Sequence, residues 1–265
     1  MLVAVMVLAA CGDRTTSPAA GTFTPHTAGT LTVVTADIPS PGFWEGTPGR
    51  VTGGFEYELA RLLEERFGLH ALRIETESFH RIVAGQIDGA DLALDLITPT
   101  SKRSESLNFS TPYLDTPPTV VARKGTNVSD LETARRLRWG IVRGTTFVGI
   151  VSSVIAPSRP VQVYGSNLAI ASALEDGEID AFLFDLPLAV VTANGSHGRL
   201  RAVAQLSEPE LIAAALPKGS QNTEAVDSAI RAFTADGTIG DLLHRWVGPA
   251  AADAEKSIPL LRTMQ

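Results

Sequence analysis

Short apolar runs of strand length alternate with helical patterns along most of this chain of 265 residues. The run at Leu31–Thr35 is followed by an amphipathic stretch from Phe55 to Phe67, which places its large apolar residues on one helical face and leaves Glu56 largely outside it. Gly68 is typical of a helix end. Further runs of strand or helix character follow at 72–74, 82–83, 91–94, 139–142, 161–164, 168–174, 181–183, 211–216, 224–233 and 238–246. This alternation predicts an α/β fold with mostly parallel sheets.

The runs fall into two successive series of strands and helices. Residues 116–121 and 202–208 carry the chain from the first series to the second and back. We therefore predict two lobes, with residues 30–115 and 207–248 in a discontinuous first lobe and residues 116–206 in the second. The chain is long enough for two modest hydrophobic cores. Two crossings predict a hinge, and the cleft between hinged lobes is a common place for a ligand.

Composition excludes several classes of function. The net charge is −7, and the 22 basic residues are scattered rather than gathered in a stripe, so nucleic acid is not an expected partner. The single cysteine, Cys11, allows neither a disulfide framework nor a cysteine zinc site. The five histidines lack metal-ligand spacing, so no metal and no other cofactor is expected.

Both ends of the chain differ from the part between them. Residues 1–10 form an apolar run too short to span a bilayer, as in a signal peptide, and Leu8–Cys11 resembles a bacterial lipobox with a lipidated Cys11. An ordinary cleavage site, or a start codon inside the gene, is the alternative, because no basic segment precedes the run. Residues 11–29 are polar and rich in Pro, Gly and Thr, which predicts a flexible tether on the extracytoplasmic face of the membrane. Residues 249–265 are predicted to form a weakly ordered C-terminal tail.

Five sequence blocks, in order, carry a resemblance to a known family. From about Leu31 to Gly248 the chain resembles the periplasmic solute-binding proteins of family 3, which serve ABC importers of polar amino acids. The blocks are GFEYELA at 54–60, DGADLAL at 88–94, ITPTSKRSESLNFSTPY at 97–113, GIVRGTT at 140–146, and GEIDA at 177–181 with Asp185.

The resemblance implies a two-lobed periplasmic-binding-protein type II fold with the ligand in the cleft between the lobes. It implies a small polar amino acid as ligand, an ABC permease as partner, a monomer and no enzymatic activity. Closure of the hinge around the ligand would create the form that the permease recognises.

A bound amino acid needs donors for its carboxylate. The resemblance implies that Arg103 supplies them, and a guanidinium can donate two parallel N–H groups to a carboxylate. The alternative is a surface arginine paired with Glu105. The turn at Gly144–Thr146 follows a strand and opens a predicted helix, so its free amides and the hydroxyls of Thr145 and Thr146 could bind the same carboxylate. Simple capping of the helix by Thr145 is the alternative there.

The ligand's ammonium needs acceptors. Asp185 stands at the C-terminal edge of a predicted strand, where ligands of α/β folds bind, and the resemblance places the ammonium-binding acid here. The alternative is capping of the helix that begins at Leu186-Pro187. The resemblance adds Thr98 and the backbone of Leu96 to the ammonium site.

The side-chain pocket is less defined. Asp95 departs from the family, which usually has a small residue at this position. This acid could favour a cationic ligand, or it could pair internally with Arg143, and the sequence does not choose. Aromatic candidates could sandwich a side chain or could belong to the core. The matching positions are Asp37, Ser40, Phe43 or Trp44, Phe79, Asp95, Arg143 and Phe184.

Two other functions fit the same fold. The first is an amino-acid receptor that senses without transport. The second is an enzyme such as a cyclohexadienyl dehydratase, or a module of a lytic transglycosylase. No G-x-S-x-G nucleophile elbow or catalytic constellation is recognisable in the sequence, so a binding protein is favoured over an enzyme.

Overall fold

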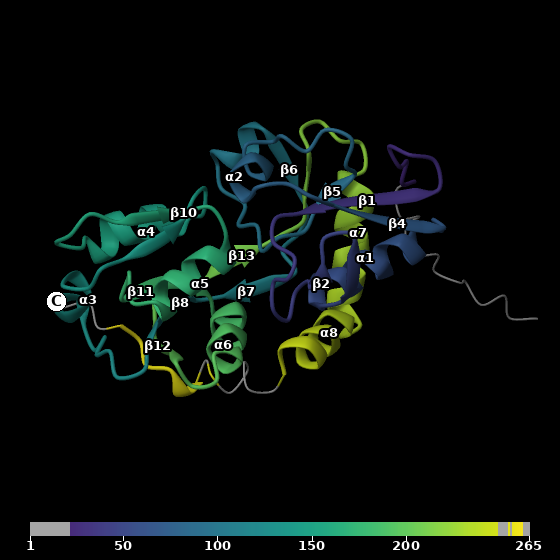
Figure 1. Cartoon of the computed structure of the whole chain (residues 1–265). Helices are drawn as coiled ribbons and strands as arrows, with labels where there is room; N and C mark the ends of the chain where they lie inside the picture. Colours follow the sequence, from purple (N-terminus) through teal and green to yellow (C-terminus); the bar gives the residue numbers. More distant parts are fainter. Residues whose placement is uncertain (1–21, 249–253, 255, 262–265) are drawn as a thin grey trace, which may run out of the picture.

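The computed structural model describes residues 22–248, 254 and 256–261. The predicted signal peptide, the lipobox with Cys11 and the first part of the tether lie outside the described residues. Two sheets, each with its own helices, lie at opposite ends of an elongated molecule (Figure 1). No helix in the described part of the chain is long and apolar enough to cross a membrane.

The first lobe is built on a five-stranded sheet of order β4-β1-β5-β14-β6. The central strand β1 pairs in parallel with β4 from Thr30↔Ala71 to Thr35↔Thr76, and with β5 on its other side. Strand β14 is antiparallel to both of its neighbours. The strands are β1 (Thr30–Thr35), β4 (Ala71–Thr76), β5 (Leu92–Ala93), β6 (Leu107–Phe109) and β14 (Ala215–Pro217), and the helices of this lobe are α1 (Phe55–Arg66), α2 (Phe79–Ile82), α7 (Thr223–Ala235) and α8 (Thr238–Val247).

The second lobe has an antiparallel sheet of order β11-β8-β12 and a parallel pair of strands, β9 and β10. A parallel bridge between Trp139 and Ala181 joins the pair to β11. The strands are β8 (Pro118–Arg123), β9 (Gly140–Val142), β10 (Gln162–Tyr164), β11 (Ala181–Asp185) and β12 (Leu200–Gln205), and the helices are α3 (Leu131–Arg135), α4 (Phe147–Ile150), which continues into a π-helical turn over Val151–Ile155, α5 (Asn167–Glu175) and α6 (Leu186–Gly195).

Two short antiparallel strands, β7 (Leu114–Thr116) and β13 (Glu210–Ile212), join the lobes at the two crossings. The segments that cross between the lobes are shorter than the sequence predicts. Most of 116–121 belongs to β8, the central strand of the second sheet, and most of 202–208 belongs to β12 or to the short link after it. The single strand predicted at 211–216 is also divided, because its first part pairs with β7 and its last part joins the first sheet.

A hairpin that the sequence does not predict precedes α1. It consists of β2 (Glu45–Thr47) and β3 (Arg50–Gly53). Gly54 then turns the chain into α1 with φ of 122°, and a side chain at this position would collide with the backbone of Phe43. This close approach fixes the entry of α1 into the first lobe.

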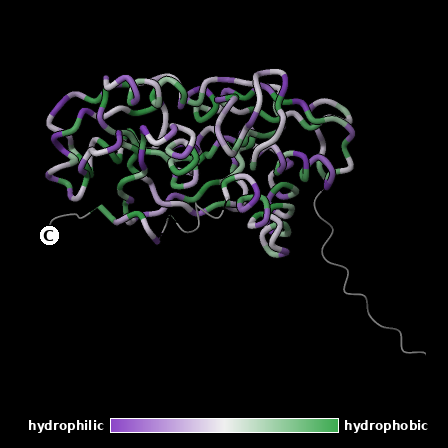
Figure 2. Tube along the Cα trace, turned by 60° about the horizontal axis from the view of Figure 1, so that its bottom comes forward, coloured by the Kyte–Doolittle hydropathy of each residue, from purple (hydrophilic) through white to green (hydrophobic). Residues whose placement is uncertain are grey.

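Apolar segments fill the interior, whereas hydrophilic segments gather along the outer loops (Figure 2). The larger core cluster holds Trp44 and Phe55 of the first lobe together with Phe182 and Phe184 of the second. A second cluster lies within the second lobe around Trp139. The core therefore continues across the contact between the lobes.

The predicted tether and tail are both partly packed. Residues 22–29 lie against the first lobe, where Phe23 stacks on Phe67 and the His26 amide donates to Asp91 at 2.6 Å. Residues 256–261, here called the C-terminal strap, return to β12 of the second lobe. There Leu260 forms a parallel bridge with Gln205, and the Leu261 amide donates to the Gln205 carbonyl at 2.7 Å. Hydrogen bonds thus hold both of these segments, for which the sequence predicts a flexible tether and a weakly ordered tail.

Candidate ligand-binding site

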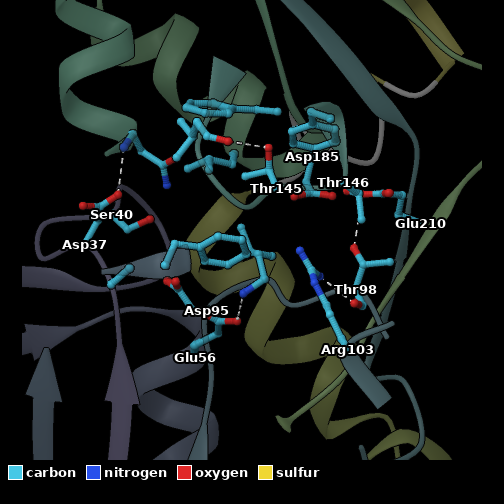
Figure 3. A pocket seen from close by; sticks show the side chains of 18 residues that line it. Asp37, Ser40, Glu56, Asp95, Thr98, Arg103, Thr145, Thr146, Asp185 and Glu210 are labelled. Atoms are coloured by element: carbon cyan, nitrogen blue, oxygen red, sulfur yellow. Dashed lines mark hydrogen bonds between the residues drawn. The ribbon is translucent and has the colours of Figure 1, made fainter. Parts of the chain in front are cut away.

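One pocket lies between the lobes and is lined from both sides (Figure 3). Arg103, Thr98, Thr146, Asp185 and Glu210 lie around one end, here called the head end. The other end, here called the acidic end, contains Asp37, Ser40 and Asp95. The remaining lining residues are Ala36, Glu56, Phe79, Leu96, Val142, Thr145, Phe147, Asn167, Phe184 and Leu188.

Arg103 lies at the start of a 3-10 turn and is only 8% exposed. Its guanidinium donates to the carbonyl of Thr98 at 2.6 Å and, across the cleft, to that of Gly144 at 2.9 Å, and it lies 5.4 Å above the ring of Phe79. Burial lowers the pKa of Arg103 to about 10, although the nearby carboxylates of Glu210 and Asp185 oppose this shift. The alternative of a surface arginine is therefore wrong. The group remains a cation at neutral pH and can bind an anion in the pocket.

The turn at Gly144–Thr146 approaches Arg103 from the second lobe. Gly144 has φ of 87°, and a Cβ there would lie 2.8 Å from the backbone of His80. The Thr145 hydroxyl donates to the Val142 carbonyl at 2.8 Å, so it does not cap α4, and the Thr146 hydroxyl donates to Glu210 at 2.8 Å. The capping alternative for Thr145 is wrong, and the hydroxyl protons of both threonines have acceptors within the protein.

Asp185 ends β11 and is 5% exposed. Its side chain makes no capping hydrogen bond to α6, although Pro187 stands in the first turn as expected. Its Oδ1 atom has no hydrogen-bond partner within the described residues. Burial raises the pKa of Asp185 well above its usual range, and the carboxylate of Glu210 raises it further. The capping alternative is therefore wrong for this carboxylate, which lines the pocket instead.

Asp37 and Asp95 make the other end of the pocket acidic. Asp37 accepts the amide of Asn167 from the second lobe at 2.8 Å, and Asp95 accepts the hydroxyl of Thr35 at 2.9 Å. Burial raises the pKa of Asp95 well above its usual range, and the charges of Glu56 and Asp37 add to the shift. Arg143 is exposed and lines a neighbouring surface hollow, so it does not pair with Asp95.

Glu56 is fully buried between the two ends, where the amphipathic pattern did not place it. Its carboxylate accepts the indole N–H of Trp44 at 2.8 Å, the hydroxyl of Tyr113, and the amide of Leu96 at 2.8 Å. Leu96 has φ of 49°, a conformation rare for leucine, and the bond that its amide donates to Glu56 holds its backbone in the pocket wall. The helical pattern misses this residue because its partners come from distant segments.

The aromatic candidates divide between pocket and core. Phe79 and Phe184 line the pocket. Phe43 is fully buried and packs edge-on against Phe55 with ring centroids 5.8 Å apart, so the core alternative holds for it. Trp44 also belongs to the core, and it reaches the pocket wall through Glu56 and through its backbone hydrogen bonds with Ser40.

Comparison with known proteins identifies the class. The model of bacterial extracellular solute-binding proteins, family 3, matches residues 31–249, and the chain belongs to this family. Among curated relatives, the L-cystine-binding protein TcyJ of Escherichia coli K12 is 26% identical over 224 residues, which cover 83% of each chain.

Solved structures confirm the predicted two-lobed type II fold. An ancestral arginine-binding protein bound to glutamine superposes with a TM-score of 0.75 at 24% identity, covering 84% of this chain and 100% of that one. An amino acid ABC transporter substrate-binding protein from Streptococcus pneumoniae, bound to L-arginine, gives a TM-score of 0.73 at 24% identity, covering 83% and 94%.

Proposed function

We propose that this protein captures an amino acid outside the cytoplasm and delivers it to an ABC permease. The observation that carries the proposal is the placement of Arg103 and Asp185 around the head end of one pocket, each from a different lobe. A guanidinium and a carboxylate that face one cavity match the two charges of an amino acid head group. The names of the relatives, which bind cystine or arginine, agree with this chemistry.

The acidic end supports a ligand with a cationic side chain. Asp37 and Asp95 face this end, and Arg103 is the one basic residue among the described residues that line the pocket. Buried carboxylates without a basic partner favour a bound cation, which offsets the cost of their ionisation. A neutral polar side chain is the second candidate.

The hinge between β7 and β13 would bring the lobes together around the ligand, with the division between lobes at 115/116 and 206/207. In this arrangement Arg103 and the backbone of the turn at 144–146 hold the carboxylate, while Asp185, Thr98 and the backbone of Leu96 hold the ammonium. The permease would then recognise the closed form.

A thermal-shift screen of the purified mature protein against the twenty amino acids tests the proposal. A ligand that binds only the native state raises the unfolding temperature, so arginine or lysine should give the largest shift. Asp185→Asn should abolish the shift and retain the fold. If none of the twenty amino acids stabilises the protein, it is not an amino-acid binder.

Anchoring through a lipid on Cys11 is part of the same proposal. Growth with a palmitate analogue should label the full-length protein and leave Cys11→Ser unlabelled. An unlabelled wild-type protein would refute the anchor and would leave the binding proposal intact.

A further inference from the structure

Glu210 was not among the residues predicted to bind the ligand, yet its carboxylate lines the head end of the pocket. It stands at the first position of β13, in the crossing between the lobes. One oxygen, Oε2, accepts the Thr98 hydroxyl at 3.2 Å and the Thr146 hydroxyl at 2.8 Å. These two threonines come from opposite lobes, so Glu210 joins both walls of the pocket (Figure 3).

These two hydrogen bonds determine what the threonines can offer a ligand. A hydroxyl has a single proton to donate and two lone pairs that accept. Because Thr98 and Thr146 both donate to Glu210, each Oγ1 atom is left as an acceptor. An ammonium group can bind to such atoms, whereas a carboxylate cannot.

The other groups at the head end point to the same ligand chemistry. The Oδ1 atom of the buried Asp185 has no partner within the described part of the chain, and it lines the same pocket. Arg103 is the only donor cation among the described lining residues, and two of its N–H groups already donate to the carbonyls of Thr98 and Gly144. Acceptors therefore outnumber free donors at this end of the pocket.

We propose that Glu210 is a specificity-determining residue that makes the head end an acceptor cage for the primary ammonium of the ligand. The cage consists of Glu210, Asp185 and the hydroxyl oxygens of Thr98 and Thr146. The inference rests on the proposed function and deepens it. It predicts that affinity depends more on a free ammonium group of the ligand than on the ligand's carboxylate. It also moves Thr146 from the carboxylate, where the sequence predicted it, to the ammonium.

Three ligands separate the two requirements in calorimetric titrations. L-Arginine has both groups, agmatine lacks the carboxylate, and Nα-acetyl-L-arginine lacks the ammonium. For the wild-type protein we expect acetylation to weaken binding about a hundredfold or more, and removal of the carboxylate to weaken it less. If the thermal-shift screen identifies a different amino acid, the three ligands become that amino acid, its decarboxylated amine and its Nα-acetylated form.

Glu210→Gln tests the residue itself with little change in volume. The variant should bind L-arginine about tenfold or more weakly and should lose at least as much affinity for agmatine, because the lost charge faces the ammonium. Glu208→Gln is the matched control: it removes a charge from the exposed side of the same crossing, outside this pocket, and should change affinity less than about twofold.

Substitution of Thr146 separates binding from a purely structural role. Thr146→Ser keeps the hydroxyl and should bind like the wild type, whereas Thr146→Val should weaken L-arginine binding, and its effect should not add to that of Glu210→Gln. Unchanged or tighter binding by Glu210→Gln would overturn the inference and would mean that Glu210 only bridges the threonines or repels the ligand. A wild-type protein that binds no amino acid would instead refute the proposed function.

Discussion

Arg103 connects the two lobes through its guanidinium as well as facing the pocket. It donates to Thr98 on its own lobe and to Gly144 on the other, and it lies against the ring of Phe79. A planar guanidinium can make these contacts and still present an N–H group to a ligand, because it carries five donors in a fixed arrangement. A lysine ammonium has three donors at one point and cannot reach the same set.

Arg103→Lys should therefore weaken binding of the ligand about tenfold, by calorimetry, and leave the circular dichroism spectrum unchanged. Arg143→Lys is the control, because Arg143 is exposed outside the pocket and its conservative replacement should have no effect on affinity. Retention of full affinity by Arg103→Lys would show that the carboxylate binds elsewhere.

Asp95 illustrates a cost in stability that accompanies a binding role. Its pKa in the folded protein is raised by burial and by Glu56 and Asp37, so the folded state holds its proton to higher pH than the unfolded state does. The contribution of this group to stability is thus fully present at acidic pH and is lost as pH rises through its folded pKa. Each unit of the shift corresponds to ~1.4 kcal/mol.

Asp95→Asn should consequently stabilise the ligand-free protein at pH 7, by roughly 1 kcal/mol or more in urea unfolding, and the gain should vanish near pH 4. The same variant should bind a cationic amino acid more weakly. An equal effect on unfolding at both pH values would mean that packing, rather than charge, explains the change.

At the level of elements, one buried carboxylate ties the segment before β1 to the first lobe. Asp91 is 4% exposed and accepts the amides of His26 at 2.6 Å and Thr32 at 2.8 Å. Asp91→Ala should lower the free energy of unfolding by about 2 kcal/mol and increase hydrogen exchange at residues 22–29. Asp88→Ala, three residues away and exposed, should change neither quantity. Unchanged exchange in Asp91→Ala would show that the stacking of Phe23 and the hydrogen bonds between Asn222 and Thr24 suffice to hold the segment.

Elements with a strong local pattern could be predicted from sequence. The helices near 55–67, 224–233 and 238–246 and the first strand lie within a few residues of α1, α7, α8 and β1. The central strand β8 could not, because Pro117 precedes it, Pro118 is its first residue, and prolines are typical of loops. Its place in the sheet depends on β11 and β12, which pair with it from distant parts of the chain.

The residues of the site also divide into those that the sequence predicts and those that it misses. Asp37, Phe79, Asp95, Leu96, Thr98, Arg103, Thr145, Thr146 and Asp185 were predicted and all line the pocket. Glu56 and Glu210 were not, because a helical pattern assigns Glu56 to the solvent side, and only the crossing of the chain brings Glu210 to the threonines. Phe43 and Arg143 match the family's sequence pattern but lie outside the pocket.

Considered as a whole, the molecule links its lobes three times. The crossings at β7 and β13 are two of these links, and the C-terminal strap is the third, since it follows α8 of the first lobe and lies along β12 of the second. Leu261 is buried in the core of the second lobe, and Ala254 packs against Leu186 and Val190 of α6. The strap thereby covers part of a sheet edge that would otherwise present unpaired backbone groups.

Deletion of residues 249–265 should lower the free energy of unfolding by roughly 2 kcal/mol, mainly through the loss of Leu261 from the core, and should increase aggregation. Chemical denaturation and light scattering measure the two effects. Deletion of 262–265 alone serves as the control and should behave like the full chain. If the longer deletion is equally stable and soluble, the strap does not contribute to the second lobe.

The strap also limits how this protein can be recombined. If the second lobe consisted only of the segment between the two crossings, it would be a single continuous insertion. A chimera could then replace this lobe with the second lobe of a relative by joining the two chains at the hinge. Here the β12 edge is completed by residues from the far end of the chain. A lobe transplanted as a single segment would lack them, so a functional graft, or a fluorescent sensor assembled from such parts, must carry 256–261 together with its lobe.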